Sequence, residues 1–406
     1  MDKGVTFRAK LVVPRPGVVI DDGALVVAQG KVRKVGTYRG SQKSASGKTV
    51  DLGDAALIPG LVNAHTHLEL TWLKRRVPAR GRFTDWLLEV MRLRGELSKD
   101  ELLASATAGA EEALRSGTTS IGAVSNTGIC ARAFNNVPMR RVIFHEIPGH
   151  TNVNERIATV EARLQRKANG ALTRHGIAPH APYSTCREIY EWSIRIATGL
   201  RLPLSTHAAE TPAEAEFLKT GEGEFREYLL RLGVPLDGWH PPGVGPIQYL
   251  AELGFLKACV QLVHCNYLSD DDIPLMRCSN VVLCPRSQAY LGHTGHPFRM
   301  LRECGVTVAL GTDSLASNDS LSVLDEMKFL HSQHVGPNDL IEMGTIAGAR
   351  ALGFDEAVGT LEPGKWADFC VVAAGDGVRQ LEDVFAPDSF VRATALAGSI
   401  VWCREE

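Results

Sequence analysis

The stretch that decides the fold is residues 57–67, which read Leu-Ile-Pro-Gly-Leu-Val-Asn-Ala-His-Thr-His. The apolar run over residues 57–63 is typical of a strand that is buried on both faces, as strands of parallel sheets are. Side chains alternate along a strand, so His65 and His67 project from the same face. Two imidazoles on one face can share a divalent metal ion; the alternative is a chance His-x-His whose rings only pack in the core.

Seven further short runs rich in Val, Ile and Leu follow this stretch, and helix-compatible segments separate most of them. Eight strands with helical spacers predict a (β/α)8 barrel, the TIM-barrel architecture, which takes about 250 residues and leaves room here for a small second domain. The further runs are 118–124, 141–147, 176–179, 202–206, 260–264, 281–284 and 306–311, and the helical segments include 102–115, 155–165, 187–198 and 320–331.

Two β-rich ends surround this middle section. Gln29-Gly30 lies between two β-rich runs and predicts a hairpin, and residues 369–373 and 399–403 form similar runs near the other end. Neither end has enough strands for a core of its own, so we expect both termini to build one small β-sandwich domain. The expected division is 1–56 and 354–406 for the β-domain and 57–353 for the barrel.

The composition excludes several classes of protein. The chain has 44 Lys and Arg against 46 Asp and Glu, a formal net charge of −2, so no basic surplus points to nucleic acid. Residues 1–17 lack the apolar core of a signal peptide, and no run of about 18 apolar residues suggests a membrane span. The 9 cysteines form no Cys-x-x-Cys pair, which predicts reduced thiols in a cytoplasmic protein.

Metal-ligand side chains stand where the predicted strands end. Active sites of such barrels lie at the carboxyl ends of the strands, and His207 ends the fifth while Asp313 follows the eighth. With His65 and His67 they predict one divalent metal ion, zinc by preference with iron or manganese as alternatives, and an open position for water. The fourth strand has no lysine at its end, which argues against a bridged two-metal site.

Three further polar residues follow predicted strands. Glu210 is a candidate proton shuttle beside His207, although it is also placed to be a solvated carboxylate at a helix start. His264, at the sixth strand, is a candidate to hydrogen-bond the attacking water or an intermediate, with a core histidine as the alternative. His180, after the fourth strand, would contact substrate or fix its own loop.

These residues resemble the amidohydrolase superfamily, in its branch of purine, adenosine-derivative and triazine hydrolases. The resemblance covers nearly the whole chain and rests on residues 57–67, 310–318 and 359–368. It implies a metal-dependent hydrolase that deaminates an amino-substituted purine ring. In that reaction Asp313 accepts a proton from the activated water, Glu210 protonates the ring nitrogen and helps ammonia leave, and His264 steadies the developing alkoxide.

A finer resemblance concerns the substrate. Residues 63–69, 120–126, 180–184 and 320–326 resemble the bacterial aminodeoxyfutalosine deaminases of menaquinone biosynthesis, which makes 6-amino-6-deoxyfutalosine the leading candidate. Deamination of S-adenosylhomocysteine or 5′-methylthioadenosine is the first alternative. A chlorohydrolase or cyclic-amide hydrolase of the same fold and a non-enzymatic scaffold also stay open, because fold alone does not fix function. The resemblance also allows a homodimer.

Four residues are candidates for binding such a nucleoside. Ser317, four residues beyond Asp313, would hydrogen-bond the far edge of the ring, and His180 would reach its sugar side. Trp86 would close over the ribose or, as the alternative, anchor the core of its helix. Glu69 would accept a sugar hydroxyl or brace its own loop.

Basic residues near the first strand offer a partner for the benzoate carboxylate of aminodeoxyfutalosine. One of them would form that pair while the others stay solvated. The candidates are Arg75, Arg76, Arg80 and Arg82. A departure from the resemblance is Gln288, which stands where this branch usually has Asn. Arg286 and Gln288 therefore shape the pocket or brace the seventh strand.

Overall fold

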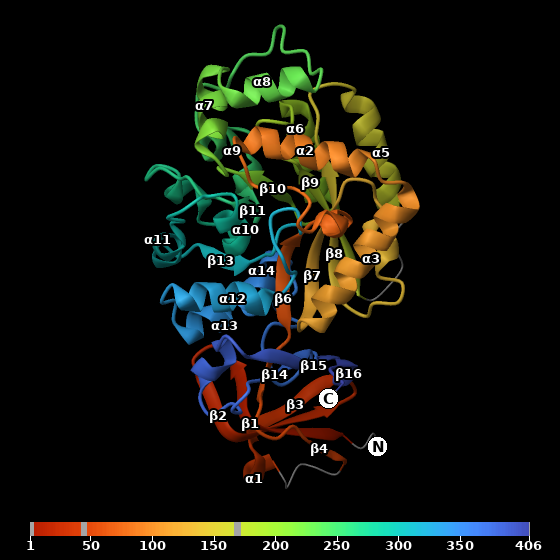
Figure 1. Ribbon diagram of the computed structural model, residues 1–406, viewed down its shortest axis with the longest axis vertical. Coiled ribbons are helices and arrows are strands. Elements are labelled where there is room, and N and C mark those ends of the chain that lie inside the picture. Colours follow the sequence, from red (N-terminus) through yellow and green to blue (C-terminus); the bar gives the residue numbers. More distant parts are fainter. Residues whose placement is uncertain (1–3, 42–46, 166–171, 406) are drawn as a thin grey trace.

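The two ends of the chain meet below a barrel in this computed structural model, which describes residues 4–41, 47–165 and 172–405 (Figure 1). Both termini lie in the small domain at the bottom of the view, and the helices and strands of the barrel rise above it. The predicted architecture, a (β/α)8 barrel with a β-sandwich domain built from both termini, is confirmed.

The small domain is one mixed sheet of eight strands, in the order β16-β15-β14-β5-β1-β2-β3 with β4 beside β1. β5 joins the two termini because it pairs in parallel with β1 and antiparallel with β14. The rings of Phe7 and Phe369 lie 4.8 Å apart in the shared core. The strands are β1 (Val5–Arg15), β2 (Val18–Ala28), β3 (Lys31–Thr37), β4 (Thr49–Asp51), β5 (Ala56–Pro59), β14 (Phe369–Ala373), β15 (Phe390–Leu396) and β16 (Ser399–Cys403).

The predicted hairpin is confirmed between β2 and β3. Gln29 and Gly30 form its two-residue turn with φ angles of 54° and 74°. Such a turn needs two residues in the left-handed region, and glycine adopts it without steric cost.

The barrel consists of two parallel four-stranded sheets that close at two seams. Thr66 bridges to Asp313 at one seam, and Ile177 bridges to Leu204 at the other. The first sheet contains β6 (Leu61–Thr66), β7 (Thr118–Ser125), β8 (Arg140–Ile147) and β9 (Thr173–Pro179). The second contains β10 (Ser205–Ala208), β11 (Gln261–His264), β12 (Asn280–Leu283) and β13 (Thr307–Leu310).

Helices separate and surround the barrel strands, as the alternating pattern predicts. The α-helices are α1 (Tyr38–Ser41) in the small domain, then α2 (Phe83–Gly95), α3 (Lys99–Arg115), α4 (Cys130–Ala133), α5 (Val153–Gln165), α6 (Arg187–Leu200), α7 (Pro212–Thr220), α8 (Glu224–Arg231), α9 (Pro246–Glu252), α10 (Pro285–Tyr290), α11 (Phe298–Glu303), α12 (Val323–Ser332), α13 (Pro337–Gly344) and α14 (Ile346–Ala351). The 3-10 segments are η2 (Leu68–Leu73), η3 (Phe255–Lys257), η4 (Ile273–Met276) and η5 (Leu381–Phe385).

Two predicted strands are corrected by the structure. The run 57–63 is two strands: β5 belongs to the terminal sheet, and β6 opens the barrel. The chain passes between them at Gly60, where a Cβ atom would lie 2.1 Å from Thr119 Oγ1, so only glycine fits. The fifth barrel strand begins at Ser205 instead of residue 202, because Pro203 has no N–H to donate to a strand ladder.

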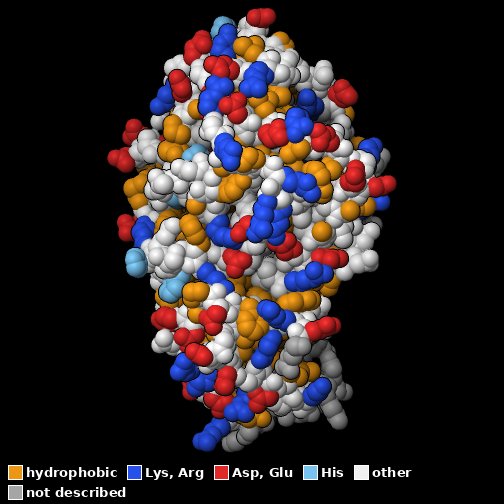
Figure 2. All heavy atoms as spheres, in the orientation of Figure 1, with side chains coloured by type: hydrophobic (Ala, Val, Ile, Leu, Met, Phe, Trp, Pro, Cys, Tyr) orange, Lys and Arg blue, Asp and Glu red, His pale blue; other side chains and the backbone are white. Residues whose placement is uncertain are grey.

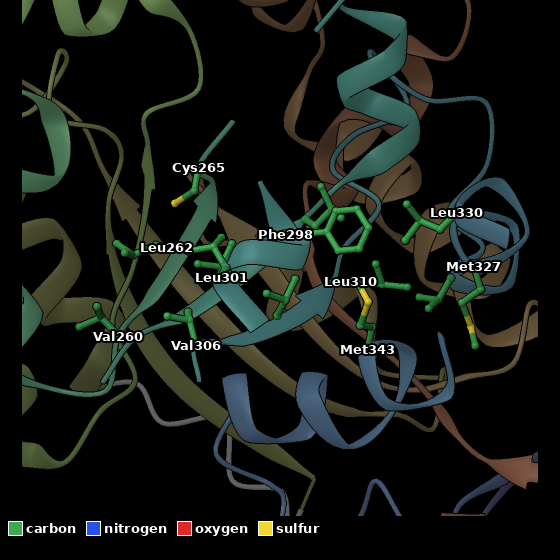
Figure 3. Close-up of a cluster of buried hydrophobic side chains, with 14 of the residues drawn as sticks. Val260, Leu262, Cys265, Phe298, Leu301, Val306, Leu310, Met327, Leu330 and Met343 are labelled. Carbon is green, nitrogen blue, oxygen red and sulfur yellow. The ribbon is translucent and has the colours of Figure 1, made fainter. Parts of the chain in front are cut away.

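The barrel core continues outward between strands and helices. Side chains from β11, β13, α11, α12 and α13 contribute to one buried cluster (Figure 3). Burying one such aliphatic side chain fully contributes about 1.5–3 kcal/mol, so this shell holds the strands in register and fixes their carboxyl ends. On the outside, acidic and basic side chains are interspersed over the face seen in Figure 2. Among the described residues, no helix is both long and apolar enough to cross a membrane.

Candidate active site

The predicted metal ligands come together at the carboxyl ends of the barrel strands. His65 and His67 lie at the end of β6, with ring centroids 4.8 Å apart. His67 Nε2 lies 3.4 Å from His207 Nε2 on β10. Asp313 Oδ1, which follows β13, lies 3.7 Å from His65 Nε2 and 3.6 Å from His67 Nε2. Four residues from three strands therefore direct donor atoms into one small volume.

Neighbouring groups orient two of these donors. His207 Nδ1 donates to the carbonyl oxygen of His180 at 2.8 Å, which leaves Nε2 facing the cluster. Asp313 Oδ2 has Ser287 Oγ at 2.8 Å and Ser317 Oγ at 2.7 Å, which leaves Oδ1 facing the histidines. Hydrogen bonds of this kind fix the tautomer and orientation of metal-binding side chains.

The donor set fits a divalent transition metal. His65 is 1% exposed, yet neither of its ring nitrogens has a hydrogen-bond partner among the described residues. Buried polar atoms are rarely left unpaired, so a ring nitrogen aimed at its neighbours calls for a ligand. Burial lowers the pKa of His67 and of His207 to about 4, so both are neutral and can coordinate. Three imidazoles and a carboxylate suit zinc, iron or manganese.

Glu210 and His264 lie beside this cluster. Glu210 Oε1 is 3.4 Å from His264 Nε2, and both side chains are buried. Burial, reinforced by the charges of Asp313 and Glu214, raises the pKa of Glu210 well above its ordinary value. Burial lowers the pKa of His264 well below its ordinary value. Burial therefore favours the uncharged form of both groups, a carboxylic acid for Glu210 and a neutral imidazole for His264.

The backbone at these strand ends is unusual. His264 has a φ of 72°, Asp313 of 54°, and Ala209, next to Glu210, of 52°. Residues other than glycine rarely adopt the left-handed region, and such strain concentrates at functional sites. The turns aim the side chains inward, and they are held by surrounding hydrogen bonds such as the one from Asn266 Nδ2 to Glu210 O at 3.1 Å.

His180 also lines this site. It follows β9, and its ring centroid lies 5.0 Å from that of His207. Its Nδ1 is 2.6 Å from Ser184 Oγ, within its own loop. His180 therefore lies where it could both contact a substrate and fix its own loop. Its contact with a substrate stays a prediction.

The other expected substrate contacts have different surroundings. Ser317 is fully buried behind Asp313, as its hydrogen bond shows, and Trp86 is buried in α2 among Leu73, Val77 and other apolar side chains. Glu69 accepts hydrogen bonds from Ser125, Thr127 and Arg94, which is a bracing role. Direct contact of these three residues with a substrate stays a prediction.

The arginines expected near a substrate carboxylate are all exposed. Arg82 is paired with Asp85 and Glu227, and Arg76 lies over the ring of Trp72. Pairing of one of the four with a substrate carboxylate stays a prediction, and the two without these contacts are Arg75 and Arg80.

Arg286 and Gln288, for which the sequence allowed two roles, lie on α10. Arg286 donates to Ser320 Oγ at 2.8 Å and pairs with Asp319, so it ties the loop after β12 to the loop after β13. Gln288 is 8% exposed, and its Nε2 is buried with no partner among the described residues. It is therefore a free donor close to Ser287, which contacts Asp313.

Sequence reasoning missed Glu146, which lies near the carboxyl end of β8. One of its carboxylate oxygens lies within 4.8 Å of ring nitrogens of His180 and His207. The run 141–147 was recognised as a strand, and a carboxylate one residue before its end was the available signal.

This chain matches one protein family and is similar to known deaminases. The model of the amidohydrolase family matches residues 56–401. A 5-methylthioadenosine/S-adenosylhomocysteine deaminase of Halobacterium salinarum is 30% identical over 385 residues, which is 89% of this chain and 82% of the relative. The enzyme of the same name from Symbiobacterium thermophilum is 27% identical over 405 residues, 94% of this chain and 87% of the relative.

Two solved structures are also similar. An adenosine deaminase from Xanthomonas campestris with bound zinc has a TM-score of 0.84 at 25% identity and covers 98% of this chain and 92% of its own. Helicobacter pylori aminofutalosine deaminase in complex with methylthio-coformycin has a TM-score of 0.87 at 25% identity, with 98% and 100% covered. The family match extends over most of the residues and includes every strand end that carries the His–Asp cluster, so this chain belongs to the amidohydrolase family.

Proposed function

We propose that this chain is a metal-dependent hydrolytic deaminase of an adenine-type nucleoside. The observation that carries the proposal is the buried pair of Glu210 and His264, 3.4 Å apart, beside a cluster of three histidines and Asp313. Replacing an amino group by oxygen on an aromatic ring requires an activated water, a proton donor for the ring nitrogen and a group that stabilises the new oxygen. The site contains a residue for each task.

One divalent ion would be held by His65, His67, His207 and Asp313. When bound, it supplies Lewis acidity and lowers the pKa of a water ligand from 15.7 towards about 7. Asp313 would accept a proton from the attacking water while it stays a ligand, and the two serines keep its Oδ2 fixed. Hydrogen bonds to the carbonyl oxygen of His180 and from the two serines fix the orientation of His207 and Asp313. These two side chains therefore need little rearrangement when a substrate binds.

Glu210 and His264 then act on the ring. The protonated Glu210 donates to the ring nitrogen next to the amino-bearing carbon, which makes that carbon electrophilic. The water oxygen bonds to this carbon, and the neutral His264 hydrogen-bonds the oxygen as charge develops. The C–N bond to the amino group then breaks. The proton that Asp313 took from water goes to the departing nitrogen, which leaves as ammonia, and the remaining water proton returns to Glu210 as the ring oxygen becomes a carbonyl. Water and the amino compound are consumed, and the oxo compound and ammonia are formed.

The group on the 5′ carbon is the finer part of the proposal. The names of the curated relatives support 5′-methylthioadenosine or S-adenosylhomocysteine as the first candidate. Aminodeoxyfutalosine, the leading candidate from the sequence segments, is the second, supported by a neighbour matched over 98% of this chain and 100% of its own. Triazine hydrolases share the fold at 18% identity, which supports the fold alone.

The test measures ammonia release by the zinc-loaded protein from 5′-methylthioadenosine, S-adenosylhomocysteine, aminodeoxyfutalosine, adenosine and guanine. We expect kcat/KM to be highest for a 5′-substituted adenine nucleoside. Glu210→Gln is the matched control, because it preserves shape and metal ligands but removes the proton donor. A preference for guanine, or no ammonia from any adenine nucleoside, would contradict the proposal. The order among the first three compounds decides the 5′ substituent only.

A further inference from the structure

Glu146 is an acidic side chain of the site to which the mechanism above gives no task. Its Oε1 is buried and has no hydrogen-bond partner among the described residues. Removing a carboxylate oxygen from water without giving it a hydrogen-bond partner costs free energy. The folded protein therefore keeps this oxygen unpaired at the expense of stability. The carboxylate lies in the substrate region, because one of its two oxygens is within 4.8 Å of ring nitrogens of His180 and His207.

The other oxygen of Glu146 is held in place. Asn126 Nδ2 donates to Glu146 Oε2 at 3.2 Å, and Arg94 Nη2 donates to Asn126 Oδ1 at 3.1 Å. The same Arg94 nitrogen lies 3.3 Å from Glu69 Oε2, so the positive charge of Arg94 is already paired with Glu69. This chain of contacts fixes the carboxylate and leaves Oε1 as a free, oriented acceptor.

A second metal ion does not explain this arrangement. Glu146, His180 and His207 could in principle hold one, but each imidazole nitrogen has one lone pair. His207 Nδ1 donates to His180 O, and His207 Nε2 faces His67 at 3.4 Å. With His207 committed to the first ion, Glu146 and His180 alone make an incomplete site.

The chemistry of an adenine nucleoside narrows the choice of ligand. A carboxylate can only accept hydrogen bonds, whereas the ring nitrogens N1, N3 and N7 of adenine are also acceptors. The donors of such a nucleoside are its amino group and its sugar hydroxyls. The amino group must face the metal cluster and the Glu210–His264 pair, which come mainly from β6, β10, β11 and β13. A sugar hydroxyl is the donor that remains for Glu146 on β8.

We propose that Glu146 is a specificity-determining residue that accepts a hydrogen bond from a ribose hydroxyl of the substrate; this rests on the proposed function. Its negative charge also disfavours a carboxylate or phosphate at this position. The acidic tail of a substrate such as aminodeoxyfutalosine therefore extends away from Glu146.

The experiment compares kcat/KM for adenosine, 2′-deoxyadenosine and 3′-deoxyadenosine in the zinc-loaded wild type and in Glu146→Ala. A hydrogen bond to a charged acceptor predicts that the wild type loses about 10- to 100-fold for one of the two deoxy compounds. In Glu146→Ala, the ratio of kcat/KM for adenosine to kcat/KM for this deoxy compound should fall close to one, because kcat/KM for adenosine itself decreases. The zinc content should stay unchanged. Glu155→Ala, an exposed acid on α5, is the control that should keep the wild-type ratio.

The outcomes separate this inference from the function on which it rests. Unchanged discrimination in Glu146→Ala, or a wild type that accepts both deoxy compounds as well as adenosine, overturns the role of Glu146 and leaves the deaminase intact. A wild type that releases no ammonia from any adenine nucleoside overturns both. Loss of zinc in Glu146→Ala would show a metal-site role instead. If the alanine variant does not fold, the near-isosteric Glu146→Gln provides the comparison. In that variant the preference for adenosine over the deoxy compound should be smaller than in the wild type but still greater than one.

Discussion

The Arg140–Asp368 ion pair at the amino ends of the barrel strands and the donor cluster at their carboxyl ends differ in how far their polar atoms are satisfied. At the amino ends of the strands, Arg140 of β8 donates to both oxygens of Asp368 at 2.6 and 3.3 Å. Asp368 also accepts from the backbone of Ala397 at 2.8 Å, so this pair is closed. At the carboxyl ends, both ring nitrogens of His65 and Oε1 of Glu146 are buried without partners among the described residues. The closed cluster joins the barrel to the terminal sheet, and the open one awaits a ligand.

A cavity near the amino ends of the barrel strands also differs from the metal-ligand cluster in how its polar groups are paired. It has a volume of about 430 Å³ and lies where the barrel meets the terminal sheet. Its charged lining residues pair with one another: Arg350 with Glu342 at 3.8 Å, and Lys365 with Glu362 at 3.9 Å. A hollow lined by such self-paired charges offers less to a ligand than the cluster of three histidines and Asp313 at the other end. The convergence of metal-ligand side chains therefore marks the functional end better than this cavity does.

The largest effect is expected from opening the metal cluster. His67→Ala removes one of four donors and should abolish most bound metal and essentially all activity, a loss beyond the 10²–10⁴-fold typical of a missing acid or base. Elemental analysis of protein purified without added metal should fall from about one ion per chain to near zero. His240→Ala, which alters an exposed histidine, should retain the ion. Full occupancy in His67→Ala would refute the ligand assignment.

Removing only the proton donor should have the next largest effect. Glu210→Gln should reduce kcat by about 10²–10⁴-fold, because glutamine keeps the shape of the side chain but cannot transfer a proton. Metal content and thermal stability should stay unchanged. The exposed Glu222→Gln serves as the control. Near-normal turnover in Glu210→Gln would show that this residue is only the carboxylate before α7.

At the amino end, the expected effect is on stability instead of catalysis. Asp368→Ala leaves Arg140 buried and unpaired and should lower the free energy of unfolding by about 3–5 kcal/mol. The folded fraction should keep the wild-type kcat. Asp51→Ala breaks an exposed pair with Arg8 at 3.1 Å and should leave the free energy of unfolding nearly unchanged, because water screens exposed pairs. Urea unfolding measures both, and equal losses would contradict the contrast between closed and exposed pairs.

A smaller effect is expected from Ser317→Ala. Loss of its hydrogen bond to Asp313 Oδ2 should weaken metal affinity or activity by about 10- to 100-fold. A chelator titration distinguishes this positioning role from the direct ring contact expected from the sequence, because ring contact alone would raise KM and leave metal affinity unchanged. Ser332→Ala, on the exposed end of α12, is the control.

The last expected effect concerns the pH dependence of stability. Burial raises the pKa of Glu214 from 4.5 to about 8, so between these values the native state holds a proton that the unfolded state has lost. Its contribution to stability is complete below pH 4.5 and disappears as the pH rises through about 8, with a slope of at most about 1.4 kcal/mol per pH unit. Glu214→Gln should flatten this slope in urea unfolding between pH 5 and 8. An unchanged slope would assign it to other groups.

The amino-acid sequence was sufficient to predict the barrel, the terminal β-domain and the residues of the donor cluster. Strand and helix periodicities are local properties, and a parallel barrel brings all strand ends to one face whatever the loops do. His65, His67, His207 and Asp313 could therefore be grouped without coordinates. The division of run 57–63 at Gly60 was not predictable from periodicity, because it depends on the approach of Thr119 from the next strand.

Tertiary structure alone decided which polar side chains are already satisfied. Glu69 and Glu146 are both glutamates near strand ends, and their local sequences do not distinguish them. Glu69 is braced by Ser125, Thr127 and Arg94, whereas Glu146, whose carboxylate lies beside two histidines, keeps one oxygen without a partner among the described residues. A hydrogen-bond partner is set by residues distant in the chain, so the sequence proposes acceptors and only the packed barrel shows which remain free for a substrate.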